Sequence, residues 1–244
     1  MLKKDLAVCI RAIDYSETSQ IVTFFAKDSG KFTAIAKGSK RHKSSFDGPV
    51  ELFAQGRIVY SQSRTDKLAT LTEFSQQPPF AFATRDLFAL HCASLTAELV
   101  NSGTDDYDPH PQLFDAFVKF LHDLDEKQDT LRQLIVFQLK LLKEIGLMPV
   151  LDHCVNCKTG HGVRGTGHGL YFSSEANGLI CRDCEPSFPD KIPVTKIAAV
   201  ALSNNETLAK TGKKTLKEIE KLLIYHFTNM WGRPPKMAKY IFEQ

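Results

Sequence analysis

Three short apolar runs, LAVCIRAI (residues 6–13), QIVTFFA (20–26) and FTAIAKG (32–38), decide the first part of the fold. They are rich in β-branched and aromatic residues and are separated by polar segments, a pattern that is typical of β-strands. The sequence Asp-Ser-Gly-Lys at 28–31 predicts a hairpin turn between the second and third runs, in which Gly30 can take a positive φ. The chain therefore begins with β structure.

Two further runs of the same kind, VELFAQGRIVYSQ (50–62) and KLATLTEF (67–74), bring the expected strands to five. Five strands in about 70 residues fit a small barrel. The sequence Gln-Pro-Pro at 77–79 follows the fifth run, and proline cannot continue the interior of a sheet. We therefore expect the first domain to end at residue 78.

Beyond residue 79 the apolar residues recur with the spacing of a helix. Helices are expected in TRDLFALHCASLTAELV (84–100), PQLFDAFVKFLHDL (111–124), TLRQLIVFQLKLLKEIG (130–146), VTKIAAVAL (194–202) and residues 215–231. The third of these is apolar around most of its surface, which places it at the centre of a bundle. The expected architecture is an α+β, multidomain fold, with a β-barrel in residues 1–78 and a helical domain in residues 79–244. A cysteine-rich insert occupies about residues 150–190.

Composition and length fit a globular protein: 244 residues, 43% hydrophobic and 24% charged. The sequence has no run of about 18 apolar residues that could span a bilayer. Asp5 and Arg11 interrupt what would be the apolar core of a signal peptide. We therefore expect a cytoplasmic protein with no membrane partner.

The net charge of +3 conceals an uneven distribution. Residues 1–75 hold 12 basic and 8 acidic groups, residues 76–150 hold 6 and 11, and residues 151–244 hold 13 and 9. Two basic ends therefore flank an acidic middle.

Four of the six cysteines form two C-x-x-C pairs separated by 23 residues: Cys154, Cys157, Cys181 and Cys184. Such pairs predict a tetrahedral site for one structural zinc ion. Because four protein ligands leave no open position, this zinc would stabilise the fold and would not activate water. Cys9 lies in a strand pattern and Cys92 in a helix pattern, so both are expected in the core.

Other interpretations of these cysteines are a dithiol redox motif or two disulfides. Both fit less well, because a redox C-x-x-C normally occurs singly and a cytosolic chain rarely keeps disulfides. A histidine could also replace one cysteine as a ligand, and His153, His161 and His168 lie nearby.

The sequence contains no signature of a serine hydrolase, a zinc protease or a phosphate-binding loop. Together with a closed zinc site, this predicts that the protein is not an enzyme and has no small-molecule substrate.

Six basic residues lie within residues 27–43, where Asp28 is the one opposing charge. Small barrels of the OB type bind single strands with a cationic groove and with exposed aromatic rings on which bases stack. The candidate nucleic-acid contacts are Lys31, Lys37, Lys40, Arg41, Lys43 and Phe46. Phe46 is expected to be exposed, because its loop is polar.

Several alternatives stay open in this interpretation. Phe25, Phe32 and Tyr60 could stack on bases or fill the barrel core, and the lysines could merely solvate a loop. A second cationic surface could form near the end of the chain, or it could be a helix surface neutralised by Glu218 and Glu220. Its lysines are Lys210, Lys213, Lys214, Lys217 and Lys221.

Five segments of the chain resemble landmarks of one known protein family. The stretches DYSETSQIVTFF (14–25) and SGKFTAIAKG (29–38) resemble the early hairpin strands of that family, and SKRHKS (39–44) resembles its basic loop. Two later features resemble landmarks of that family in their order and approximate position. They are the cysteine pairs, which follow a helix that ends in GLMP, and the sequence WGRPPK (231–236). Together these segments resemble the RecO family of bacterial recombination mediators, and the resemblance covers essentially the whole chain.

The resemblance implies an N-terminal OB fold, a helical domain that bears the zinc site, and no enzymatic turnover. It implies binding to single- and double-stranded DNA, annealing of complementary strands, contacts with the SSB protein and RecR, and help for RecA in replacing SSB. The protein would associate with the nucleoid while it acts. The basic loop with Lys37, Lys40, Arg41 and Lys43 is the best candidate for a DNA contact. Some members of the family lack the cysteines, which supports a structural role for zinc.

Two competing functions remain at this point. One is a protein-interaction scaffold that zinc stabilises and that has incidental DNA affinity. The other, weaker one is an unrecognised zinc hydrolase.

Overall fold

The computed structural model describes residues 2–41, 46, 48–62, 68–126, 128–160 and 169–242. By their packing the residues form two compact units, 1–128 and 129–244, which we describe separately. The domain boundary expected after residue 78 stays a prediction.

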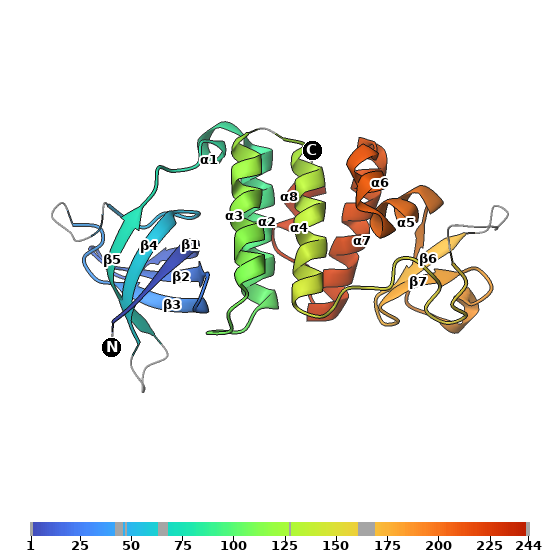
Figure 1. The fold of residues 1–244 in the computed structure, drawn as a ribbon, viewed down its shortest axis with the longest axis horizontal. Helices are drawn as coiled ribbons and strands as arrows, with labels where there is room; N and C mark the ends of the chain where they lie inside the picture. The colour runs from blue at the N-terminus through green and yellow to red at the C-terminus, as the bar shows by residue number, and fades with distance from the viewer. Residues whose placement is uncertain are drawn as a thin grey trace. The chain divides into compact units, whose positions relative to one another are not determined.

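The first unit opens with five strands that close into a barrel (Figure 1). They are β1 (Leu2–Asp14), β2 (Gln20–Ala26), β3 (Gly30–Ala36), β4 (Gln55–Ser61) and β5 (Ala69–Gln76). Their order round the barrel is β1-β2-β3-β5-β4, and β4 pairs with β1 to close it. The β3–β5 pair is parallel and the other pairs are antiparallel. This OB-like barrel confirms the predicted fold class.

Aromatic side chains fill the interior of the barrel. Phe24 lies edge-on to Phe74 with ring centroids 5.4 Å apart, and Phe32 stacks on Tyr60 at 4.3 Å. All four are buried. Phe32 and Tyr60 therefore belong to the core and are not available to stack on bases.

Three helices belong to the same unit: α1 (Phe82–Arg85), α2 (Leu87–Gly103) and α3 (Pro111–Asp125). Phe25 of β2 packs on Phe114 and Phe117 of α3, with ring centroids 5.9 and 6.2 Å away. Phe25 is fully buried, so it too is a packing residue. Strand β2 therefore buries neighbouring side chains on opposite faces, one inside the barrel and one beneath a helix.

The hairpin predicted at residues 28–31 joins β2 to β3, and Gly30 has a φ of +70°. A Cβ atom at this position would lie 2.3 Å from the carbonyl oxygen of Asp108. Both the turn and the close approach of the segment after α2 therefore require glycine here.

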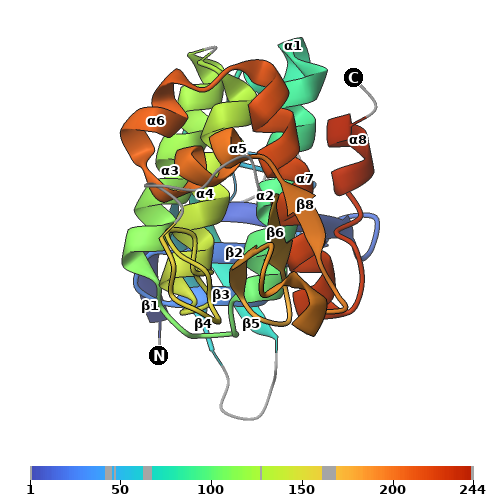
Figure 2. The same ribbon diagram turned by 90° about the vertical axis from the view of Figure 1, so that its right-hand side faces the viewer.

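The second unit contains α4 (Thr130–Glu144), α5 (Lys196–Ser203), α6 (Asn205–Lys210), α7 (Lys213–Trp231) and α8 (Ala238–Phe242). Its three strands are β6 (Leu170–Ser173), β7 (Gly178–Cys181) and β8 (Ile192–Val194). They form a sheet with the order β7-β6-β8, in which β6 and β8 are labelled in Figure 2. A 3-10 turn, Glu185–Ser187, follows the last cysteine. Helix α4 packs on α7, and the Arg132 guanidinium on α4 donates to the carbonyl oxygens of Leu208 and Thr211.

The structure departs from the sequence prediction in two places. The fourth strand begins at Gln55 and not at residue 50, because Phe53 adopts a φ of +67° in a turn. The insert contains a hairpin of two four-residue strands, β6 and β7, that the glycine-rich sequence around it concealed.

Among the described residues, no helix combines the length and the apolar character that a membrane span requires.

Candidate metal centre and nucleic-acid interface

The sulfur atoms of Cys154, Cys157, Cys181 and Cys184 all lie within 4.8 Å of one another. All six cysteines of the chain are free thiols. The Sγ atoms of Cys157 and Cys181 are 3.6 Å apart, far beyond the length of about 2.05 Å of a disulfide bond. The two C-x-x-C pairs therefore meet as a cluster that could hold one metal ion, and the disulfide interpretation is wrong.

Local backbone structure shapes the two halves of this cluster. After the first pair, Lys158 takes a φ of +62°, and its N–H donates to the carbonyl oxygen of Cys154. The second pair follows β7 directly, and the N–H of Cys184 donates to the carbonyl oxygen of Cys181. Each pair thus lies in a tight turn that directs two sulfurs to one point.

Polar groups of the protein also contact the sulfurs. The N–H of Cys181 donates to Sγ of Cys154 at 3.4 Å, and the side-chain amide of Asn156 donates to Sγ of Cys184 at 3.3 Å. Hydrogen bonds with Thr159 lower the pKa of the Cys157 thiol to about 6, whereas burial raises that of Cys181 to about 12. A bound cation would favour the thiolate form of all four.

Of the histidines considered as substitute ligands, His153 is described, and it is not part of the cluster. His153 faces Asp152, with its Nδ1 atom 2.7 Å from a carboxylate oxygen. His161 and His168 lie outside the described residues. The two single cysteines, Cys9 and Cys92, are fully buried in the first unit, as predicted.

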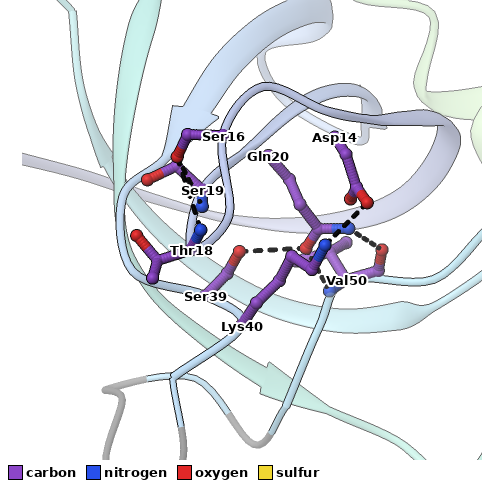
Figure 3. A network of polar contacts seen from close by, with 8 residues as sticks. All are labelled: Asp14, Ser16, Thr18, Ser19, Gln20, Ser39, Lys40 and Val50. Atoms are coloured by element: carbon purple, nitrogen blue, oxygen red, sulfur yellow. Dashed lines mark hydrogen bonds and ion pairs between the residues drawn. The ribbon is translucent and has the colours of Figure 1, made fainter.

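The basic segment, which we define as residues 37–41, leaves the end of β3 and lies against the loop that joins β1 to β2 (Figure 3). The backbone N–H of Lys40 donates to the carbonyl oxygen of Thr18, and the N–H of Gly38 donates to the hydroxyl of Ser19. Lys37, Lys40 and Arg41 are exposed residues, although the side chain of Lys40 is only 29% accessible. The structure thus places three cations on one segment with a fixed backbone.

A buried side chain, Gln20, connects the two ends of the longer connection between β3 and β4. Its carbonyl oxygen accepts from the hydroxyl of Ser39 at 2.9 Å and from the N–H of Val50 at 2.9 Å. Its amide nitrogen donates to the carbonyl oxygen of Val50 at 3.2 Å (Figure 3). Gln20 therefore joins the basic segment to the residues that lead into β4.

Lys40 is also paired with an acidic group. Its Nζ lies 2.6 Å from a carboxylate oxygen of Asp14 at the end of β1, and both groups face solvent in part. An exposed pair of this kind is worth little to stability. The Asp14 carboxylate offsets part of the positive charge of Lys40.

The structure corrects the prediction for Lys31. Its Nζ donates to the carbonyl oxygens of Asn101 and Thr104 at 2.7 and 2.6 Å, and its side chain is only 11% exposed. These carbonyls end α2, where unpaired C=O groups and the helix dipole favour a cation. Lys31 therefore stabilises the packing of α2 on the barrel and does not face a ligand.

The prediction that Phe46 is exposed is wrong. Phe46 is 5% exposed and belongs to the barrel core, where it forms an isolated bridge with Phe74. Its polar neighbours concealed an apolar anchor, because a single ring is enough to fix a loop to a core. Lys43, the remaining candidate, lies outside the described residues.

One exposed aromatic residue near the basic segment was not predicted. Tyr15 lies between Asp14 and Ser16 in the β1–β2 loop and is 63% exposed. The sequence did contain a signal, because Tyr15 lies in a polar stretch between two apolar runs and so falls outside the alternating pattern that places strand residues in the core.

The lysines near the end of the chain lie on α6, α7 and the turn between them. Lys210, Lys213, Lys214 and Lys221 are exposed and Lys217 is half-buried. Of the two acidic neighbours, Glu218 accepts from the N–H and hydroxyl of Thr195, and Glu220 is buried against Gln138. These glutamates thus serve packing and capping.

Comparison with known proteins finds two family models that match the chain. The model described as Recombination protein O N terminal matches residues 1–78, and the model described as Recombination protein O C terminal matches residues 84–238. Over 220 residues the chain is 32% identical to the "DNA repair protein RecO" of Bacillus subtilis (strain 168), with 89% of this chain and 83% of that protein covered. It is 30% identical over 248 residues to the protein of the same name from Bacillus pumilus (strain SAFR-032), with 99% and 94% covered.

Proposed function

Because the chain belongs to the RecO family, we propose that it is a DNA repair protein of homologous recombination that binds single- and double-stranded DNA and anneals complementary strands. The observation that carries this proposal is the match of both family models, which together span nearly the whole chain. The exposed cations of the basic segment support it.

The proposed DNA contact is electrostatic. Lys37, Lys40 and Arg41 would neutralise phosphates and release their counterions, which gives binding without sequence preference that weakens as salt is added. Two strands held on one cationic surface repel each other less than in solution, so their bases can pair. No base-specific contact is needed for annealing.

The proposed role in recombination is to help load RecA onto DNA that the SSB protein covers, in contact with SSB and RecR. This part of the proposal rests on the family alone. We propose no enzymatic step, because every part of this function is binding.

We propose zinc as the metal of the four-cysteine cluster. Zinc–sulfur bonds of about 2.3 Å place the sulfurs of a regular tetrahedron about 3.8 Å apart. The 3.6 Å between Cys157 and Cys181 and the upper limit of 4.8 Å for the cluster fit this arrangement. Bound there, zinc would cross-link the segment after α4 to the end of β7 and so stabilise the second unit.

A strand-annealing assay tests the proposal. Complementary labelled oligonucleotides are mixed at low salt, with and without SSB on one strand, and the rate of duplex formation is measured. We expect the protein to accelerate annealing in both cases. A protein that neither binds nor anneals oligonucleotides at low salt would contradict the proposal and favour the scaffold function.

The assay has a matched control in the same barrel. A variant with Lys37, Lys40 and Arg41 replaced by alanine should lose most of the acceleration. Replacement of Lys3, Lys4 and Arg57 removes the same number of exposed charges near the opposite end of β1, about 25–35 Å away along the strand. This control should anneal like the unmodified protein.

A further inference from the structure

We propose that Tyr15 is the platform on which an unpaired base stacks when single-stranded DNA follows the basic segment. The inference rests on the proposed DNA binding and adds to it a residue and a substrate preference. Lysines attract any phosphate backbone, whereas an exposed aromatic ring selects bases that are free to stack.

The exposure of Tyr15 is the first observation. Among the aromatic side chains of the described residues, Tyr15 is the one that is exposed, with 63% of its surface accessible. The others are buried or half-buried, including Phe25, Phe32 and Tyr60. A single exposed apolar side chain is common on protein surfaces, so the inference rests on the position of this ring beside the basic segment as well as on its exposure.

A rigid turn holds Tyr15 in place. The N–H of Tyr15 donates to the carbonyl oxygen of Ser19 at 2.9 Å, and the N–H of Ser16 donates to the same oxygen at 3.1 Å. The hydroxyl of Ser16 in turn accepts from the N–H of Ser19 at 3.1 Å (Figure 3). The backbone on both sides of the ring is thus ordered before DNA binds, which reduces the entropic cost of stacking.

The same turn is joined to the basic segment. Thr18 and Ser19 accept the backbone N–H groups of Lys40 and Gly38, and Lys40 also reaches Asp14, the residue before Tyr15. Figure 3 shows the contacts of Ser16 with Thr18 and Ser19, and the ion pair between Lys40 and Asp14. An aromatic ring and an ammonium group therefore lie on two segments that hydrogen bonds hold together, which is the combination that single-strand binding uses.

This geometry separates the contributions of the two kinds of side chain. The cations contact phosphates in both single and double strands, but in a duplex the bases are already stacked on one another. Tyr15 should therefore add affinity for single strands only.

The first test measures the affinity of the Tyr15→Ala variant for a dT oligonucleotide and for a duplex of equal length. Loss of one stacked base should weaken single-strand binding about five- to 150-fold and leave duplex binding within about twofold. Tyr15→Phe keeps the ring and should restore single-strand affinity. Leu87→Ala removes a side chain of similar exposure at the start of α2 and serves as the matched control.

The second test places a reporter at the site. The chain has a single tryptophan, Trp231, which lies in α7 of the second unit. In a Trp231→Phe background, Tyr15→Trp is the only tryptophan, and stacking of a base on it should quench its fluorescence when the dT oligonucleotide is added. The duplex should quench it much less.

The outcomes distinguish this inference from the proposed function. If Tyr15→Ala binds single strands as the unmodified protein does, while the triple variant at Lys37, Lys40 and Arg41 does not, the stacking role is wrong and the DNA-binding function stands. Equal loss of single-strand and duplex affinity would also overturn it, because Tyr15 would then act through the fold of the turn. If the unmodified protein binds neither DNA, the proposed function itself fails.

Discussion

Replacement of Glu220 by glutamine should make the protein more stable above neutral pH. Glu220 is fully buried on α7, where its Oε1 accepts from the side-chain amide of Gln138 at 2.9 Å. Its Oε2 and the amide oxygen of Gln138 are both buried, with no hydrogen-bond partner among the described residues. A proton on Glu220 would allow the second hydrogen bond of a closed acid–amide pair.

Burial raises the pKa of Glu220 from 4.5 to about 7, and the hydrogen bond from Gln138 opposes this rise only in part. The folded protein therefore keeps a proton that the unfolded chain releases, so the free energy of unfolding falls as pH rises from 4.5 to 7 and is level above that. With 1.36 kcal/mol for each pH unit of difference, the loss between pH 5.5 and 8.5 is about 2 kcal/mol.

Urea unfolding at pH 5.5, 7.0 and 8.5, followed by circular dichroism, measures this loss. Glu220→Gln carries the second donor at every pH, so its free energy of unfolding should exceed that of the unmodified protein by about 2 kcal/mol more at pH 8.5 than at pH 5.5. Glu220→Ala should also lack this pH dependence and should be less stable than Glu220→Gln by about 1–3 kcal/mol at every pH, because the Gln138 amide is left unpaired. Parallel pH profiles for the unmodified protein and Glu220→Gln would refute the reasoning.

Three further predictions concern the site residues. Cys181→Ser should reduce bound zinc, expected at about one per chain by elemental analysis, and should unfold the second unit in circular dichroism; a metal-free protein with an unchanged melting curve would contradict this. Gln20→Ala should lower the free energy of unfolding in urea by about 1–3 kcal/mol and should also weaken DNA binding, because the Ser39 hydroxyl and the Val50 N–H lose their acceptor. Unchanged stability would show that the hydrogen bonds of Gln20 do not hold the basic segment in place. Asp14→Asn should release Lys40 and raise single-strand affinity by about two- to fivefold in a fluorescence titration, and a fall in affinity would contradict the proposed position of the phosphates.

The barrel and the cysteine cluster could be predicted from the sequence because each depends on local pattern. Short apolar runs with a glycine turn specify strands, and Gly30 indeed has the positive φ that the hairpin needs. The C-x-x-C spacing brings two sulfurs together within each tight turn, so only the meeting of the two turns depends on the rest of the fold.

Lys31 and Phe46 could not be placed from the sequence because their environment comes from distant segments. The sequence around Lys31 does not indicate that its ammonium group contacts the carbonyl oxygens at the end of α2 and stabilises that helix end. Nothing in the polar loop around Phe46 indicates that its ring enters the barrel. Tyr15 was overlooked for the opposite reason, because its role depends on what the fold leaves uncovered.

The salt dependence of single-strand affinity tests the central claim most directly, namely that the chain binds DNA through the cations of the basic segment. The affinity for a dT oligonucleotide is measured at several salt concentrations for the unmodified protein and for the variant with Lys37, Lys40 and Arg41 replaced by alanine. Each lost phosphate contact on a single strand reduces the slope of log K against log salt by about 0.7, so we predict a slope shallower by about 2 and weaker binding at low salt. Equal slopes and equal affinities for the two proteins would contradict the claim.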